Sequence, residues 1–215
     1  MKNIEAIVFD MDGLMFDTEK LWIDAVIRAN KENGYQVPLE FAIDCIGKRS
    51  DETNHLLEEQ LGININEYRP LIDKYMNDDI RENGLRIKKG LMELLDYLKD
   101  KNIKLAIASS SEIDYVKNIL REANIDENIF TSIIGGDMVL VPKPDPYIYL
   151  KSCEVLGVNP NNTLCLEDSD YGIKAAFDAG LIPILIPDIK QPTEDTIKMA
   201  YKKLDSLLEV IDLLS

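Results

Sequence analysis

The sequence predicts an α/β protein with a doubly wound, mostly parallel sheet and a small α-helical cap inserted after the first strand. Three observations point to this fold class. Short apolar runs rich in β-forming residues alternate with amphipathic helical patterns along most of the chain. These runs are apolar throughout, as in strands buried on both faces of a parallel sheet. The alternation stops only between about residues 16 and 86, where the patterns are helical.

Five apolar runs are the expected strands. Their residues are 4–9, 104–108, 129–134, 163–166 and 182–186. Each of the first four ends in charged, hydroxyl or glycine residues, which marks the point where the strand leaves the core. The fifth contains Pro183 and is followed by Pro187. Because proline cannot donate a ladder hydrogen bond, the sequence leaves the ends of this strand open.

Amphipathic helices are expected between and after these strands. Residues 91–99 carry four leucines on one helical stripe. Similar patterns cover residues 112–124, 146–156 and 171–179, and Gly180 is a candidate C-terminal cap for the last of them. Residues 204–214 are expected to form a closing helix. Together with the strands, these helices predict a Rossmann-like core.

The segment that interrupts the alternation predicts a second, helical unit. Its amphipathic patterns include residues 21–33 and 51–61, and it contains no convincing strand. A unit of this size can pack as a short helical bundle. We therefore assign residues 1–15 and 87–215 to an α/β core domain and residues 16–86 to an α-helical cap domain.

The composition argues against several classes of protein. The 215 residues carry 24 Lys and Arg against 39 Asp and Glu, which gives a formal net charge of −15. This charge disfavours binding to nucleic acid, which requires a basic face, and docking on anionic lipid. No apolar run approaches the roughly 20 residues of a membrane span, and the first residues do not resemble a signal peptide. We expect a cytoplasmic monomer that binds a small molecule.

The cysteines indicate neither a disulfide framework nor a zinc site. Only Cys45, Cys153 and Cys165 occur, and they are scattered without a CxxC pair. Cys153 and Cys165 lie in apolar contexts and are expected to be buried thiols. A reducing compartment fits this usage.

Polar residues follow four of the expected strands or the loops after them. They are Asp10 and Asp12, Ser109, Lys143, and Glu167 with Asp168. In open α/β sheets, ligands bind outside the carboxyl ends of the strands, so these distant positions are expected to meet at one rim. The convergence, more than any single motif, predicts a functional site there.

The carboxylates at this rim predict a metal site. Asp10 and Asp12 stand two residues apart at a strand end, and like charges that close are costly unless a cation or a proton intervenes. Asp168 adds a third carboxylate from another strand end. Oxygen ligands of this kind suit Mg²⁺. Taken alone, the DxDG sequence is also compatible with a surface turn.

The serines and the lysine indicate an anion at the same rim. Ser109–Ser111 precede an expected helix, where one serine is a candidate helix cap and the group is a candidate anion site. Lys143 lies between Pro142 and Pro144, which restrict its backbone. A fixed cation facing several carboxylates is reasonable if a phosphate lies between them.

At this point the chain resembles a known family, the haloacid dehalogenase superfamily. The resemblance rests on four ordered motifs: DMDGLMFDTE at residues 10–19, Ser109 after an apolar strand, KPDP at 143–146 and LEDSDYG at 166–172. It covers essentially the whole chain. The helical insertion after the first motif is similar to the cap of the β-phosphoglucomutase and phosphatase branch.

The resemblance implies a role for each motif residue. Asp10 would be the nucleophile that forms an aspartyl phosphate, and Asp12 the general acid and base. Mg²⁺ would be held by Asp10 and Asp168 and by the backbone carbonyl of Asp12, with support from Glu167. The transferring phosphoryl group would be bound by Ser109, Ser110 and Lys143. Dehalogenases and the phosphonate hydrolase of the superfamily lack an aspartate at the position of Asp12, so its presence favours phosphate esters.

The cap is expected to select the substrate. Residues 47–52 resemble the family's specificity loop, in which Arg49 is a candidate for binding a second anionic group; the alternative is that Lys48 and Arg49 are solvated loop charges. His55 is expected on a helix surface, and Trp22 in the cap core or the pocket wall. In β-phosphoglucomutases a histidine stands at the position of Trp22, and the loop arginine comes one place later than Arg49.

These observations favour a Mg²⁺-dependent phosphatase of a small phosphorylated metabolite, with a sugar phosphate preferred. The alternative is a β-phosphoglucomutase that transfers phosphate between two hydroxyls of a sugar. A binding or regulatory module that kept the fold without activity is the least favoured interpretation, because both Asp10 and Asp12 are present.

Overall fold

A computed structural model of the chain describes residues 3–215 and shows a six-stranded, all-parallel sheet. The strand order is β3-β2-β1-β4-β5-β6. The strands are β1 (Ala6–Phe9), β2 (Lys104–Ala108), β3 (Ser132–Ile134), β4 (Thr163–Glu167), β5 (Ile182–Leu185) and β6 (Lys202–Lys203). The fold class expected from the sequence is confirmed. Residues 1 and 2, which we assigned to the core domain, lie outside the described residues.

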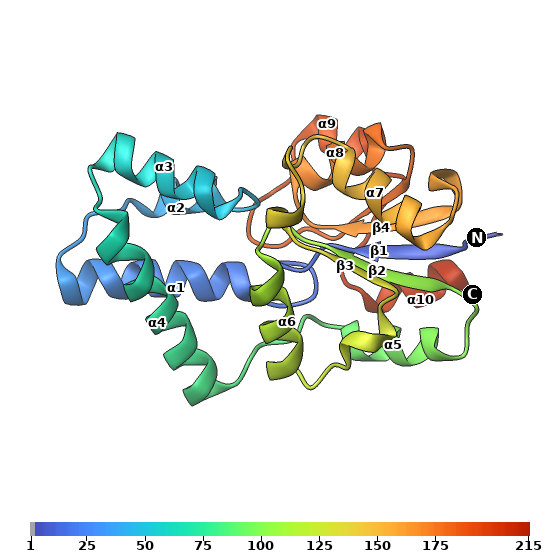
Figure 1. The fold of residues 1–215 in the computed structure, drawn as a ribbon, viewed down its shortest axis with the longest axis horizontal. Coiled ribbons are helices and arrows are strands. Elements are labelled where there is room, and N and C mark those ends of the chain that lie inside the picture. The colour runs from blue at the N-terminus through green and yellow to red at the C-terminus, as the bar shows by residue number, and fades with distance from the viewer. Residues whose placement is uncertain (1–2) are drawn as a thin grey trace.

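Helices cover both faces of the sheet, and its central strands are therefore buried on both sides (Figure 1). In β1, Ile7 and Phe9 face one apolar cluster and Ala6 and Val8 face the other. The first cluster is completed by α5 (Leu91–Lys99), α6 (Ile113–Glu122) and α10 (Leu208–Leu214), and the second by α7 (Tyr147–Leu156) and α8 (Asp170–Asp178). The chain crosses from β2 to β3 through α6, from β3 to β4 through α7 and from β4 to β5 through α8, as a parallel sheet requires.

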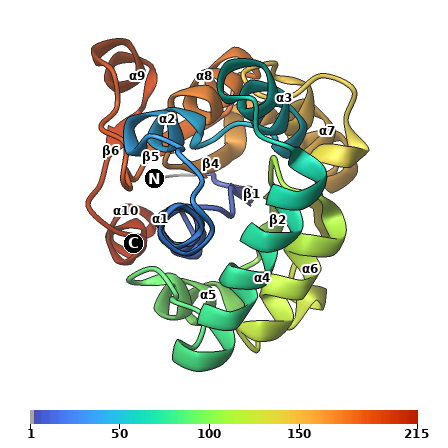
Figure 2. The same cartoon turned by 90° about the vertical axis from the view of Figure 1, so that its left-hand side faces the viewer.

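Four helices form a separate group across the carboxyl ends of the strands (Figures 1 and 2). They are α1 (Thr18–Asn33), α2 (Leu39–Cys45), α3 (Ser50–Leu61) and α4 (Ile65–Asn83). Their apolar faces share a core of their own that includes Val26, Leu57, Tyr68 and Ile72. The division into a core domain and a cap remains our proposal; Phe16, which we placed in the cap segment, packs in the core beneath the sheet.

Two segments differ from the expected elements. Only residues 132–134 of the third apolar run are a strand, because a 3-10 turn, Glu127–Ile129, precedes it. The closing segment holds a short helix α9 (Glu194–Met199) and β6 before α10. The two residues of β6 are exposed lysines, so no apolar signal marks them in the sequence.

Pro183 lies inside β5, between β4 and β6. Its carbonyl accepts a hydrogen bond from the backbone N–H of Tyr201, and β6 begins only at the following residue. The missing N–H of the proline therefore falls where its neighbour strand has not yet begun.

The three cysteines are buried free thiols in the part of the chain that the structure describes. Among residues 3–215, no helix combines the length and the apolar character needed to cross a membrane.

Candidate active site

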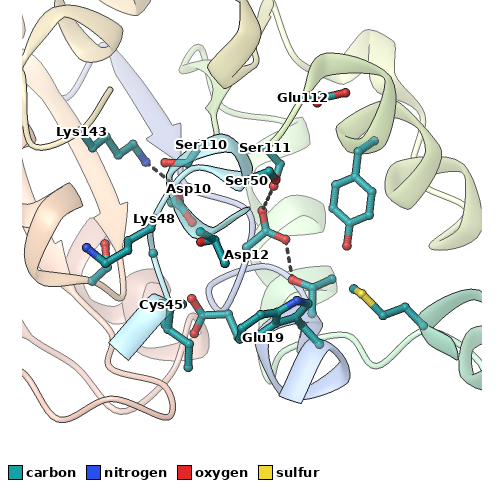
Figure 3. A pocket seen from close by; sticks show the side chains of 18 of the residues that line it. Asp10, Asp12, Glu19, Cys45, Lys48, Ser50, Ser110, Ser111, Glu112 and Lys143 are labelled. Carbon is teal, nitrogen blue, oxygen red and sulfur yellow. Dashed lines mark hydrogen bonds and ion pairs between the residues drawn. The ribbon is translucent and has the colours of Figure 1, made fainter. Parts of the chain in front are cut away.

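Most of the expected site residues meet in a cavity between the sheet and the cap helices (Figure 3). Asp10 directly follows β1, and Asp168 directly follows the neighbouring β4, so the two carboxylates lie side by side at the rim. The cavity is lined from the core by Asp10, Asp12, Ser110, Ser111, Lys143 and Asp168, and from the cap by Thr18, Glu19, Trp22, Lys48 and Arg69, among others. The convergence predicted from the strand ends is present.

Lys143 forms the centre of a buried ion-pair group. Its ammonium donates hydrogen bonds of 2.6 Å to Oδ1 of Asp10, 2.7 Å to Oε1 of Glu167 and 3.0 Å to the carbonyl of Ala108. Figure 3 shows Lys143 and Asp10 pointing toward one another. All three N–H groups of the ammonium are therefore used, which holds the cation in one position beside the first strand.

Glu167 accepts hydrogen bonds on both of its oxygens. Oε1 accepts from Lys143 and from the hydroxyl of Tyr149 at 2.6 Å. Oε2 accepts from the backbone N–H groups of Asp168 and Ser169 at 3.1 and 3.2 Å, and from the Ser169 hydroxyl at 3.0 Å. Burial raises the pKa of Glu167, but Lys143 and these donors outweigh it and hold the pKa below its ordinary value.

Asp12 is held by hydroxyl groups rather than by a cation. Thr18 donates at 2.6 Å to Oδ1, while Ser111 and Ser109 donate at 2.8 and 3.3 Å to Oδ2. The Ser111 bond is visible in Figure 3. Three hydroxyls from α1 and from the loop after β2 thus orient a carboxylate that lines the cavity. This environment suits a group that gives and takes protons at one place.

The serine loop is arranged differently from the expectation. Ser109 is fully buried, and its oxygen also accepts a hydrogen bond from the backbone N–H of Ser111 at 3.0 Å. Ser110 and Ser111, not Ser109, line the cavity. Ser109 thus supports Asp12 and the loop, and the groups facing the cavity are its two successors.

Three carboxylates could hold a metal ion. One ligand oxygen from each of Asp10, Glu167 and Asp168 lies within 4.8 Å of the others, and all three residues are buried. Burial, followed by its carboxylate neighbours, raises the pKa of Asp10 to about 8 even though Lys143 lowers it. The pKa of Asp168 is also raised, first by burial and then by Glu19. Such a concentration of buried carboxylates is stabilised by a hard divalent cation, so the donor set fits Mg²⁺.

Glu19 belongs to the same acidic group, and sequence reasoning missed it. Its side chain is buried, and Oε2 has no hydrogen-bond partner. A Cβ placed on Gly13 would stand 2.4 Å from Oδ2 of Asp168 and 2.9 Å from Oε2 of Glu19, so only glycine lets the loop pass between them; its φ of +79° also favours glycine. An unpartnered buried oxygen beside Asp168 supports the same fit to a cation. Glu19 closes the DMDGLMFDTE motif, but the motif by itself does not show that this side chain joins the acidic group.

The cap residues divide into those that face the cavity and those that do not. Lys48 faces it and contacts the core: its ammonium donates to the Tyr171 hydroxyl at 3.1 Å and to Glu52 at 2.8 Å. Arg49 pairs with Asp51 at 2.9 Å and is not among the cavity residues. His55 lies exposed on α3 beside Glu59, as expected.

Three further cavity residues carried no signal in the sequence or only a weak one. Trp22 lines the cavity and also packs against the cap core, in agreement with both of its expected places. Arg69 enters from α4, where it pairs with Asp73 at 2.9 Å, and Tyr115 enters from α6. Their positions are set by the packing of distant helices, so local sequence patterns do not reveal them.

Known proteins are similar to this chain in sequence and in fold. The family model described as haloacid dehalogenase-like hydrolase matches residues 7–186. A phosphorylated carbohydrates phosphatase of Thermotoga maritima is 33% identical over 180 residues, which cover 83% of this chain and 82% of that protein. A β-phosphoglucomutase of Bacillus subtilis is 30% identical over 225 residues, covering 93% and 95%.

A solved structure agrees with these sequence matches. The crystal structure of a β-phosphoglucomutase from Clostridium difficile superposes with a TM-score of 0.76 at 26% identity, and the match covers 96% of this chain and 93% of that one. The sequence matches, this superposition and the four motifs meeting in one cavity lead to the same assignment. The chain belongs to the haloacid dehalogenase-like hydrolase family and is an enzyme.

Proposed function

We propose that this enzyme is a Mg²⁺-dependent phosphatase that hydrolyses a small phosphorylated metabolite through an aspartyl-phosphate intermediate. The observation that carries the proposal is the pairing of Asp10 with Lys143 at 2.6 Å on the floor of a cavity that also contains Asp12. A carboxylate held beside a fixed cation suits attack on a phosphoryl group, whose charge that cation offsets.

The residues divide the reaction into two steps. In the first, an oxygen of Asp10 bonds to phosphorus, the bond from phosphorus to the leaving oxygen breaks, and Asp12 gives that oxygen a proton. In the second, Asp12 takes a proton from water as the water oxygen bonds to phosphorus, and the bond to Asp10 breaks to release phosphate. Lys143 offsets the charge of the phosphoryl group from its place beside Asp10, and Ser110, which lines the cavity, binds the phosphoryl oxygens.

Asp10, Asp168 and the backbone carbonyl of Asp12 would hold the Mg²⁺, which supplies charge neutralisation for the phosphoryl oxygens. Glu167 lies in the same group of carboxylates, but its oxygens are occupied by donors. We therefore assign it to holding Lys143 and the backbone around Asp168.

A phosphorylated sugar or polyol is the preferred substrate. The relative from Thermotoga maritima is named for phosphorylated carbohydrates, and the carboxylate of Glu19 and the ammonium of Lys48 line the cavity from the cap. Carboxylate and ammonium groups of this kind recognise hydroxyls. Arg49 would reach a second anionic group only by leaving Asp51.

A β-phosphoglucomutase is the second candidate, because a relative bears that name. A mutase must keep water from its aspartyl phosphate until a sugar hydroxyl arrives. Trp22 lines the cavity where those enzymes have a histidine, which favours water as the acceptor. Incubation with β-glucose 1-phosphate and a trace of glucose 1,6-bisphosphate decides between them. Phosphate release supports the phosphatase, and rapid glucose 6-phosphate formation with little phosphate supports the mutase.

Hydrolysis of p-nitrophenyl phosphate tests the proposed function directly. We expect activity with MgCl₂ and none with EDTA, and no turnover by Asp10→Asn, whose amide is isosteric but cannot form the acyl phosphate. Asp100→Asn, an exposed change on the core, is the matched control and should retain activity. Turnover by a pure Asp10→Asn preparation close to that of the control would refute the proposal. Gel filtration of the same proteins checks the expected monomer.

A further inference from the structure

The hydroxyl of Tyr149 is a buried polar group that lies behind the cavity and has no part in the two steps above. Tyr149 is in α7 and is completely buried. It is not among the residues that line the cavity, so substrate does not reach it. Its hydroxyl donates a 2.6 Å hydrogen bond to Oε1 of Glu167.

Tyr149 contacts both members of an ion pair. Oε1 of Glu167, which accepts its hydroxyl, is the same atom that accepts from Lys143 at 2.7 Å. The Lys143 ammonium also lies 5.0 Å from the centre of the Tyr149 ring, a distance that allows a cation–π contact. Tyr149 therefore affects the position of Lys143 in two ways: its hydroxyl binds the partner carboxylate, and its ring contacts the ammonium.

The Glu167 carboxylate is held in place through Oε2, so it cannot move when a donor to Oε1 is lost. Oε2 is held by the Asp168 and Ser169 backbone and by the Ser169 hydroxyl. On the other side, a Cβ on Gly172 would stand 1.8 Å from Oε1, so α8 already packs directly against the carboxylate. The charge that Glu167 offers to Lys143 is thus set by how many other donors Oε1 accepts.

Lys143 shares its donors between two carboxylates that compete for it. The 2.6 Å bond to Asp10 and the 2.7 Å bond to Glu167 are nearly equal in length. When Oε1 of Glu167 also accepts the Tyr149 hydroxyl, part of its charge is satisfied, and its pull on the ammonium is weaker. Without that hydroxyl, the ammonium would be drawn toward Glu167 and away from Asp10.

We propose that Tyr149 is a positioning residue for phosphoryl transfer: acting through Glu167, its hydroxyl keeps the Lys143 ammonium against Asp10, where the phosphoryl group is bound and transferred. This role rests on the proposed function. It concerns the transition state more than substrate binding, because Tyr149 does not line the cavity and acts only through Glu167 and Lys143.

Tyr149→Phe removes the hydroxyl and keeps the ring. Tyr147→Phe is the matched control, since Tyr147 lies in the same helix with its side chain half exposed. With p-nitrophenyl phosphate and saturating Mg²⁺, we expect Tyr149→Phe to lower kcat on the order of tenfold to a hundredfold, as for loss of a buried hydrogen bond to a charged group. KM should stay within about twofold, and Tyr147→Phe should match the wild type.

A double-mutant cycle separates positioning from a structural role. If Tyr149 acts through Glu167, Tyr149→Phe has no further effect on kcat in a Glu167→Gln background. Independent losses that multiply, or a kcat of Tyr149→Phe within about twofold of the wild type, would overturn the inference.

The unfolding free energies of the same four proteins, measured in urea, give a second cycle that needs no activity. Coupling between the two changes is expected there as well, and its absence overturns the inference. If Tyr149→Phe does not fold, kcat of Glu167→Gln serves instead: activity equal to the wild type would show that the ion pair does not position Lys143. Failure of the wild type to hydrolyse any phosphate ester refutes the proposed function. The double-mutant cycle of unfolding free energies then still tests the Tyr149–Glu167 hydrogen bond.

Discussion

Asp10 and Lys143 stand 133 positions apart in the chain, yet their side chains meet at 2.6 Å in a buried hydrogen-bonded ion pair. The side chain of Lys143 is 3% exposed and that of Asp10 is 10% exposed. Burial by itself would lower the pKa of Lys143, but Asp10 and Glu167 reverse this and raise it above its ordinary value. The lysine is therefore charged at physiological pH, and it offsets the charge of Glu167 and that of Asp10 when Asp10 is ionised.

Removal of this cation should affect both activity and stability. Lys143→Met keeps the length of the side chain but leaves Asp10 and Glu167 buried next to one another without their partner. We expect a loss of about 3–5 kcal/mol in unfolding free energy, as for breaking one side of a buried ion pair, together with loss of turnover. Urea unfolding and p-nitrophenyl phosphate hydrolysis measure the two effects. Lys151→Met, at a half-exposed position of α7, should change neither.

Glu19 is expected to lower the unfolding free energy of the metal-free protein. Its buried Oε2 has no partner, and burial followed by Asp188 raises its pKa well above the ordinary value. Glu19→Gln keeps the shape of the side chain and, unlike the carboxyl, needs no proton to be neutral in this acidic group, so we expect it to raise the unfolding free energy in EDTA by about 1 kcal/mol or more. Excess Mg²⁺ should reduce or reverse the gain. A variant less stable than the wild type in EDTA would contradict this reasoning, and Glu59→Gln on the exposed face of α3 is the control.

The stability of the metal-free protein should fall as pH rises. The pKa of Asp10 is about 8 in the folded chain against an ordinary 3.8, so between these values the folded state binds a proton that the unfolded state does not. The stabilisation is complete below the lower value and is lost as pH rises through the higher one, with a slope of up to about 1.4 kcal/mol per pH unit. Asp168 shifts in the same direction.

Urea unfolding in EDTA at about pH 5 and about pH 8 measures this loss. Because Mg²⁺ favours the ionised carboxylates, the decline should be much smaller when it is present. Equal pH dependence with and without Mg²⁺ would show that the cation does not bind to this group.

Gly172 is expected to tolerate no side chain. A Cβ there would stand 1.8 Å from Oε1 and 1.9 Å from Cδ of Glu167, and that carboxylate is fixed by its donors. Gly172→Ala must therefore displace either α8 or Glu167, and we expect it to cost about 1–3 kcal/mol, as for overpacking of a core, and to lower kcat with it. Thermal unfolding and kcat are the measurements. Lys174→Ala on the exposed face of α8 should have little effect on either, and near-normal values for Gly172→Ala would show that Glu167 is free to move.

Much of the fold and the position of the site follow from the sequence alone. Buried parallel strands require continuous apolar runs, so β1, β2, β4 and β5 are visible in it, and a polar residue directly after such a run marks the rim of the sheet. For this reason the meeting of Asp10, Asp168 and Lys143 could be predicted. The helical character of residues 18–83 follows from their amphipathic patterns in the same way.

Only the tertiary structure decided which neighbours in a loop face the cavity. Gly47 adopts a φ of +80° next to Ser169, and the loop that follows directs Lys48 to Tyr171 while Arg49 turns to Asp51. In the serine loop, Ser109 is directed inward to Asp12, and the cavity receives the next two serines. In both loops, neighbouring residues of similar chemistry point in different directions because of the local backbone conformation. Composition and spacing in the sequence do not reveal that conformation.

The hydrogen-bond partners of Glu167 also could not be predicted from the sequence, because they come from distant segments of the chain. The sequence places it beside Asp168 as a candidate metal ligand, but Tyr149 and Lys143 reach it from different segments and occupy one of its oxygens. Tyr149 is indistinguishable from an apolar helix residue in the sequence, because its hydroxyl matters only through a contact with another strand end. The end of β4, which the sequence reveals, determines where the Glu167 side chain lies. The packing of α7 against the sheet, which only the tertiary structure shows, brings the Tyr149 hydroxyl to it.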